Sequence, residues 1–111
     1  MTTIDRPVFE ALKETAGADF VVELVDAFFE EAPGMLEAMR GSLAAGDAEK
    51  FRRAAHSLKS NANTFGATGL GAIAKDLELS GLANVAARPE PLAAVNEEYA
   101  RVAAALKEMC R

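Results

Sequence analysis

The sequence "FRRAAHSLKSNANTFGATGL", residues 51–70, carries the clearest evidence of how this chain folds. Its apolar residues recur three or four positions apart, which is the spacing of one face of an α-helix. Gly66 can adopt the left-handed backbone conformation that ends helices, and helical spacing resumes directly after it. We therefore expect a helix over residues 48–65, a tight turn at Gly66 and another helix from Thr68 or Gly69.

The rest of the chain repeats this helical spacing, and no run of alternating apolar and polar residues is long enough to indicate a strand. Pro33 interrupts an apolar stripe over residues 19–45, but the stripe keeps its phase, which favours one kinked helix over two. Pro89 and Pro91 mark the break before a last helix. The inward-facing residues of that helix follow a seven-residue repeat: Leu92, Val95, Tyr99, Val102, Leu106 and Met109.

A short additional helix precedes these four. Asp5 can cap it, Pro7 fits its opening turn, and Gly17 can end it. Short connections favour antiparallel packing of neighbouring helices. The sequence therefore predicts an all-α protein, an antiparallel four-helix bundle with a short N-terminal capping helix, and its 111 residues suit a single domain over 1–111.

Charge and composition exclude several classes of protein. Seventeen acidic residues against twelve basic ones give a net charge of -5, whereas nucleic-acid binding needs a basic surface. Cys110 is the only cysteine and has no partner for an internal disulfide. The first residues lack the pattern of a signal peptide, and the longest uncharged run, residues 60–74, is too short and too polar to cross a membrane. We expect a soluble cytoplasmic protein without a nucleic-acid or membrane partner.

The only histidine, His56, lies on the polar side of its helix. With about 100° per residue on a helical wheel, the apolar residues of this helix fall between about 100° and 180° away from it. His56 therefore points outward. Five polar or basic residues lie within about 60° of it on the same wheel. They are Arg52, Arg53, Lys59, Ser60 and Asn63.

This arrangement favours phosphoryl chemistry over the alternatives. Metal sites use several ligands, but here a single histidine has cationic neighbours that repel a metal ion. No acid at a suitable spacing can orient the ring for hydrolysis, and no glycine-rich nucleotide loop is present. A neutral imidazole is a competent nucleophile toward phosphorus, and Lys59, with Arg52 as a second positive charge, can offset the phosphoryl oxygens. A charged face kept for solubility is the alternative.

The segment "AHSLKSNANTFGATGLGAIAKDLE", residues 55–78, resembles the histidine-containing phosphotransfer (HPt) domain family. The family signature is H-x-[ILM]-K-G, followed by a glycine ten residues after the histidine. The upstream segment, residues 24–54, is similar to the helix that precedes the active-site helix in the family. The resemblance implies that His56 is phosphorylated through Nε2, that Lys59 stabilises the phosphate, and that Gly66 ends the active-site helix.

Two further positions near His56 do not match a letter of the family signature. Ser60 replaces the usual glycine, which in the family leaves room for the partner's catalytic pocket, and serine is small enough that we expect docking to survive. Asn63 matches no fixed letter of the signature. Its wheel position allows a bond to a phosphoryl oxygen or to the ring, but it also suits a polar surface residue.

By resemblance, we expect a single HPt domain that shuttles a phosphoryl group between receiver-domain aspartates through His56. Its partners would be receiver domains of response regulators or of a hybrid histidine kinase, with Mg²⁺ held by the receiver. We expect no cofactor of its own and no autonomous kinase activity. An adaptor bundle that docks receivers without accepting phosphate is the alternative, and a phosphohistidine hydrolase is a weaker one.

Overall fold

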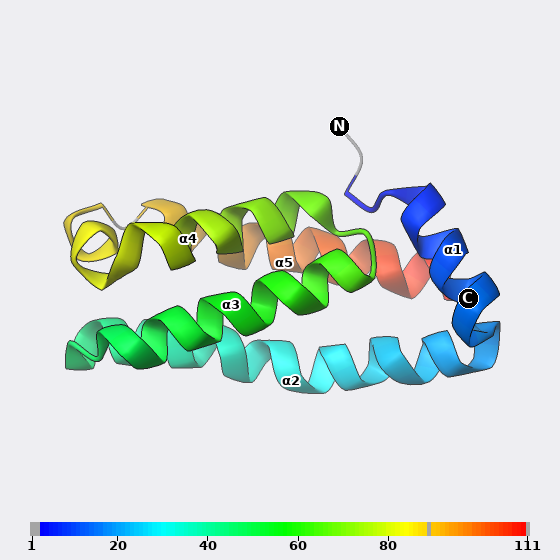
Figure 1. Cartoon of the computed structure of the whole chain (residues 1–111), viewed down its shortest axis with the longest axis horizontal. Helices are drawn as coiled ribbons and strands as arrows, with labels where there is room; N and C mark the ends of the chain where they lie inside the picture. Colours follow the sequence, from blue (N-terminus) through cyan, green and yellow to red (C-terminus); the bar gives the residue numbers. More distant parts are fainter. Residues whose placement is uncertain (1–2, 89, 111) are drawn as a thin grey trace.

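The computed structural model describes residues 3–88 and 90–110, and the regular structure in that part of the chain is entirely helical (Figure 1). The five helices are α1 (Arg6–Ala16), α2 (Ala18–Ala45), α3 (Ala48–Thr64), α4 (Thr68–Ala87) and α5 (Glu90–Met109). Helices α2 to α5 run in alternating directions along the 41 Å long axis, and α1 crosses one end of them (Figure 1). The predicted antiparallel four-helix bundle with an N-terminal capping helix is confirmed.

The core lies between the four long helices and is continuous along their length. At its centre, the ring of Phe28 on α2 packs against Phe65, 5.4 Å away, and Tyr99 on α5, 5.8 Å away between ring centroids. Offset and edge-to-face aromatic packing of this kind adds stability beyond the apolar area that it buries. The predicted inner seam of α5 is also found, since Val95, Val102 and Leu106 are fully buried and the other three residues are partly buried.

Helix α2 continues through Pro33 without interruption, as the phase of its apolar stripe predicts. It begins at Ala18, one residue earlier than expected, and ends at Gly46, whose φ of +75° is the left-handed conformation of a helix C-terminus. The carboxylate of Asp47 then accepts a hydrogen bond of 3.0 Å from the backbone N–H of Lys50. Because this bond satisfies a free donor in the first turn of α3, it fixes where α3 starts.

The first and third helices differ from the prediction in detail. Asp5 precedes α1, but its side chain makes no capping hydrogen bond; instead its backbone N–H donates to the carbonyl oxygen of Gly66 at 2.7 Å. Helix α3 ends at Thr64, so Phe65 lies in the turn, where its ring is buried in the core. Capping helix α1 is therefore tied to the turn between α3 and α4.

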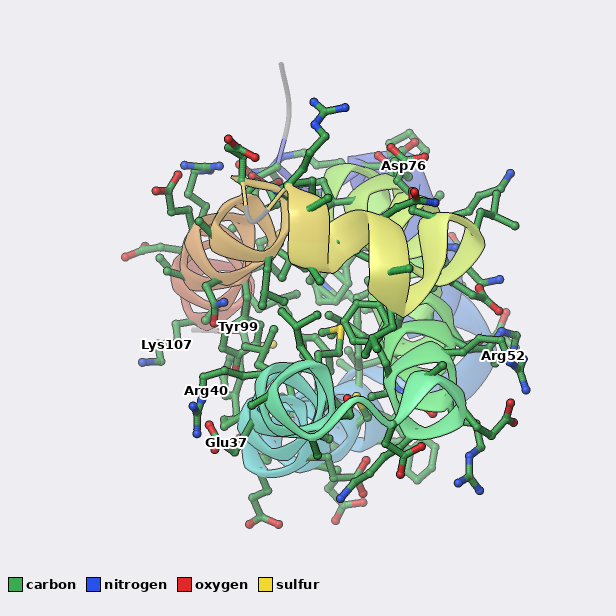
Figure 2. All side chains as sticks on the ribbon, turned by 90° about the vertical axis from the view of Figure 1, so that its left-hand side faces the viewer. Glu37, Arg40, Arg52, Asp76, Tyr99 and Lys107 are labelled. Carbon is green, nitrogen blue, oxygen red and sulfur yellow. The ribbon has the colours of Figure 1, made fainter. Side chains whose placement is uncertain are left out.

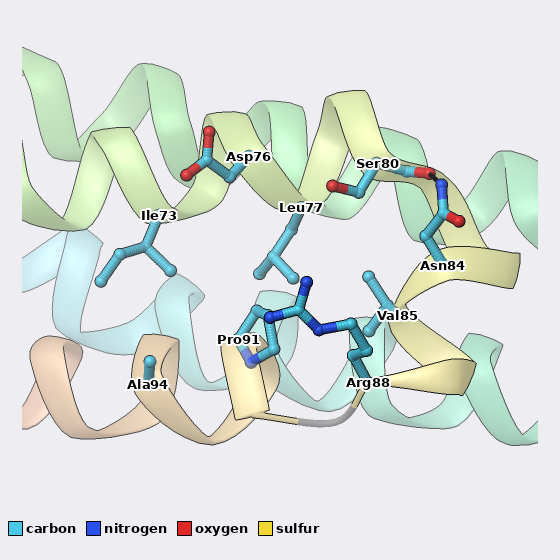
Figure 3. A pocket seen from close by; sticks show the side chains of 9 residues that line it. All are labelled: Ile73, Asp76, Leu77, Ser80, Asn84, Val85, Arg88, Pro91 and Ala94. Atoms are coloured by element: carbon cyan, nitrogen blue, oxygen red, sulfur yellow. Dashed lines mark hydrogen bonds between the residues drawn. The ribbon is translucent and has the colours of Figure 1, made fainter.

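A break in α4 at Gly81 was not predicted. Gly81 has φ +78° and ψ 169°, a conformation that ends regular helix and that glycine adopts without strain. The last turns of α4 and the start of α5 then enclose a pocket of about 390 Å³, with Leu77 and Val85 at its floor and Arg88 across its mouth (Figure 3). Pro91 lies in the first turn of α5, where proline is tolerated, and Pro89 lies outside the described residues.

Gly66 is under two constraints, and they predict the effect of replacing it. Its φ is +81°, and a Cβ there would lie 2.7 Å from the backbone oxygen of Asp5 and 3.1 Å from Cβ of Val8. We expect Gly66→Ala to destabilise the protein by more than the roughly 1–2 kcal/mol of left-handed strain alone. The measurement is the free energy of unfolding in denaturant.

Gly46→Ala is the matched control, because Gly46 has a similar φ of +75° but a Cβ there would meet nothing within 4 Å. It should show the conformational cost without the clash. Equal destabilisation by the two substitutions would show that the close contacts of Gly66 with Asp5 and Val8 add no cost.

Candidate functional site

His56 lies near the middle of α3, with 55% of its side chain exposed. The opposite side of the helix is packed into the core, where Phe51, Ala55, Leu58 and Ala62 are fully buried. The predicted orientation is confirmed: α3 buries one side and presents the imidazole to solvent.

A carboxylate from the neighbouring helix holds the ring. Glu78 on α4 places Oε2 2.9 Å from Nδ1 of His56 and Oε1 2.9 Å from Nζ of Lys59. Only 13% of the Glu78 side chain is exposed, so one nearly buried carboxyl group joins the histidine and the lysine. The site is thus a cluster of three side chains from two helices.

The prediction that no acid can orient the ring is wrong, because it considered only the helix that carries the histidine. A signal for Glu78 was present in the spacing. In two antiparallel helices joined by a tight turn, residues equally far from the turn lie at the same level along the helices, and those on the facing sides can meet. His56 and Glu78 are both eleven residues from Ala67, which lies between α3 and α4.

The charge state of Glu78 fixes the tautomer of the ring. The hydrogen bond from Lys59 is the largest cause that holds the pKa of Glu78 below its ordinary value; burial opposes it, and the bond to His56 adds to the lowering. Glu78 is therefore ionised at neutral pH and only accepts hydrogen bonds. In neutral His56 the proton must then reside on Nδ1, which leaves the lone pair of Nε2 free for chemistry.

The other predicted site residues lie around this cluster with different partners. Arg52 projects from the bundle on the side opposite Lys107 (Figure 2), and its guanidinium donates to Glu49 at 2.6 Å, a bond that raises the pKa of Arg52. Ser60 is exposed one turn after His56. Arg52 and Ser60 thus lie on the same side of α3 as His56, but neither is hydrogen-bonded to its ring.

Asn63 and Gly66 lie further along α3. The side chain of Asn63 covers Gly71, where a Cβ would meet Oδ1 at 2.1 Å. Asn63 is two turns from His56, about 10 Å along the axis. Its geometry shows a contact between α3 and α4, and its predicted bond to phosphate stays a prediction. Gly66 forms the turn that brings Glu78 opposite His56.

The described residues contain neither a cluster of metal ligands nor a membrane-spanning helix. Within residues 3–88 and 90–110, no three side chains of His, Cys, Asp or Glu are grouped closely enough to hold a metal ion. None of the helices in the same part of the chain is long and apolar enough to span a membrane.

The Glu78 contact predicts the tautomer of His56 in solution. In the parent protein, ¹⁵N NMR of the neutral ring should show the proton on Nδ1, because an ionised acceptor faces that nitrogen. Glu78→Ala should shift the ring toward the Nε2–H form. Glu49→Ala is the control, since Glu49 is an exposed carboxylate that bonds arginine and not the ring. An unchanged tautomer in Glu78→Ala would show that the contact does not orient the histidine.

Comparison with known proteins identifies the class to which this fold and site belong. The family model described as "Hpt domain" matches residues 23–105, which include His56, Lys59 and Glu78. The chain belongs to the Hpt domain family. It is a histidine phosphotransfer protein of phosphorelay signalling.

A solved structure gives a particular relative. The chain is similar to histidine-containing phosphotransfer protein B (HptB) from Pseudomonas aeruginosa PAO1, with 28% sequence identity and a TM-score of 0.87. The match covers 97% of this chain and 94% of the HptB chain. No curated protein sequence matches this chain. The structural similarity therefore extends beyond the part covered by the family match, through the capping helix α1.

Proposed function

We propose that His56 receives a phosphoryl group from the aspartyl phosphate of one receiver domain and passes it to the aspartate of another. The observation that carries this proposal is the state of the imidazole. Nδ1 is engaged by an ionised carboxylate, while the ring is more than half exposed and Nε2 makes no hydrogen bond to the described residues. A nucleophile held on one side and open on the other suits transfer from a partner protein.

The transfer needs no further reagent. The Nε2 lone pair attacks phosphorus, the N–P bond forms as the P–O bond to the receiver aspartate breaks, and the departing carboxylate keeps the bonding pair. The Nδ1 proton stays on the ring, which thereby becomes positively charged. Glu78 faces this charge at 2.9 Å and stabilises it. The reverse sequence, with a second aspartate as the nucleophile, returns the ring to its neutral form.

Lys59 is placed to assist in both directions. It follows His56 by one helical turn, and its ammonium group is held 2.9 Å from Glu78, with a quarter of the side chain exposed. A phosphoryl group on Nε2 would bring negative oxygens within reach of this cation. Lys59 can then share its charge between the carboxylate and the phosphoryl oxygens without leaving its place.

The remaining parts of the reaction are assigned to the partner. Receiver domains of response regulators or of a hybrid histidine kinase would supply the aspartate, the surrounding cavity and Mg²⁺, so this chain would need no cofactor and no kinase activity. We propose the cytoplasm as the compartment it shares with them. The alternative, an adaptor that docks receivers without accepting phosphate, is disfavoured by the geometry around His56, since binding alone needs no oriented nucleophile.

Phosphoryl transfer to His56 can be tested directly. Incubation with a phosphorylated receiver domain should give the parent protein an acid-labile, alkali-stable label, and His56→Gln should remove it. Ser57→Ala, a change at an exposed neighbour, should keep the label. Incubation with ATP alone should leave the parent unlabelled. Label that persists in His56→Gln would exclude His56 as the acceptor, and binding of the receiver without any label would favour the adaptor.

A large substitution at Ser60 tests whether the receiver domain covers this part of α3 during transfer. Ser60→Phe should leave the fold intact, because the residue is exposed and surface changes usually alter stability by only about 0.5 kcal/mol. It should slow transfer from a receiver by roughly a hundredfold, because displacing the reacting atoms by about 1 Å has an effect of that order. Transfer kinetics and thermal melts on the same protein give both quantities.

Ala104→Phe is the control for this change, since it adds the same bulk at an exposed position of α5. It should neither unfold the bundle nor slow transfer. A parental transfer rate in Ser60→Phe would place Ser60 outside the surface that the receiver covers.

A further inference from the structure

Two contacts fix the register in which α3 and α4 face each other. His56 meets Glu78 at 2.9 Å, and Asn63 covers Gly71 closely enough that a Cβ there would lie 2.1 Å from its oxygen. In each pair the two residues are equally far from Ala67 in the turn. Residues equally far from Ala67 therefore lie at the same level along the two helices, and the levels of the residues between these pairs follow from it.

The same register places Lys75 of α4 at the level of Lys59 of α3, each eight residues from Ala67. Lys75 lies four residues after Gly71 and three before Glu78, so it shares their side of α4, the side that faces α3. Packed helices lie about 8–10 Å apart, and a lysine side chain extends over much of that distance. Lys75 is exposed, so its ammonium group is free to move toward the ring of His56.

The cations already at the site are paired with carboxylates, so they do not balance the charge of an added phosphoryl group. Lys59 and Glu78 form an ion pair and cancel each other. Arg52 and Arg53 both lie near the single carboxylate of Glu49, at 2.6 Å and 3.8 Å. A phosphoryl group adds a charge of roughly -1.5 to -2 at neutral pH, and the positive charge that the ring gains on phosphorylation offsets only part of it. The pairs already present therefore do not compensate it fully.

Lys75 is available to compensate this charge. Among the described residues its ammonium group makes no hydrogen bond or ion pair. The adjacent carboxylate, Asp76, lies on a different side of α4, where it lines the pocket that faces α5 (Figure 3). Glu78, the carboxylate one turn away from Lys75, is already bonded to Lys59 and His56.

We propose that Lys75 is a second cation for the phosphoryl group on His56, acting from α4 while Lys59 acts from α3. The proposal rests on phosphorylation of His56, as proposed above. Lys59 is held in place by Glu78 before the phosphoryl group arrives, whereas Lys75 has no partner among the described residues to give up. Its effect is to stabilise phosphohistidine relative to aspartyl phosphate.

The equilibrium constant for transfer from a phosphorylated receiver domain separates this role from docking. At protein concentrations where the complex is scarce, the constant compares free phosphohistidine with free aspartyl phosphate. A residue that only contacts the receiver alters the forward and reverse rates equally and leaves the constant unchanged. Lys75→Gln should lower the constant about two- to fivefold, the range expected from one exposed ion pair. Lys75→Arg should restore it, and high salt should reduce the difference from the parent.

Lys107→Gln is the control, because it removes the same charge from α5, on the side of the bundle away from Arg52 (Figure 2). It should leave the constant unchanged. An equilibrium constant in Lys75→Gln equal to that of the parent would overturn the proposal, whether or not the transfer rates fall. A parent that takes no label on His56 would instead overturn the proposed function, so the two failures are distinguishable.

Discussion

The antiparallel register of α3 and α4 is the constraint on which the site depends. It is set at the turn, where Gly66 adopts a positive φ and its carbonyl oxygen accepts the backbone N–H of Asp5. A shift of one residue in either helix would rotate its side chains by about 100° and separate His56 from Glu78. The start of capping helix α1 is therefore connected to the geometry of the site, since Asp5 is bonded to the turn that joins the two helices.

One carboxyl group then contacts both other side chains of the cluster. Glu78 orients the imidazole through Nδ1 and holds the ammonium group of Lys59 one turn along α3. Each cationic or polar partner favours its ionised form, and that form is the one that can only accept hydrogen bonds. The cluster is therefore self-consistent: the lysine keeps the glutamate charged, and in the neutral ring the charged glutamate places the proton on Nδ1 and leaves Nε2 with its lone pair.

The sequence alone was sufficient to predict features that depend on the residues of a single helix. Apolar spacing predicted the four long helices, the continuity of α2 through Pro33 and the outward direction of His56, because each follows from a residue's position on its own helix. Two contacts between separate segments were missed. Glu78 comes from the neighbouring helix, and Asp5 uses its backbone at Gly66 and not its side chain as a cap.

The break at Gly81 was missed for a different reason. A glycine within an apolar helical pattern is compatible with a continuous helix or with a break, and local spacing does not decide between them. In the structure the break allows Val85 to reach the core beside the start of α5. The residues after the break pack beside α5, which lies outside the stretch of sequence that a local pattern describes.

A carrier of phosphoryl groups must accept its cargo and also release it, and this requirement explains why the cations are arranged as they are. A fully buried, unpaired cation beside His56 would hold the phosphoryl group strongly, because charges interact strongly where water is excluded. Here Lys59 is shared with Glu78 and the ring is open to solvent, so each interaction with the phosphoryl oxygens of a phosphorylated His56 would be partial. Under the proposed function, such partial interactions would keep phosphohistidine close in free energy to the aspartyl phosphates of its partners. Under that function, transfer would then proceed in both directions, and the partners would set its direction.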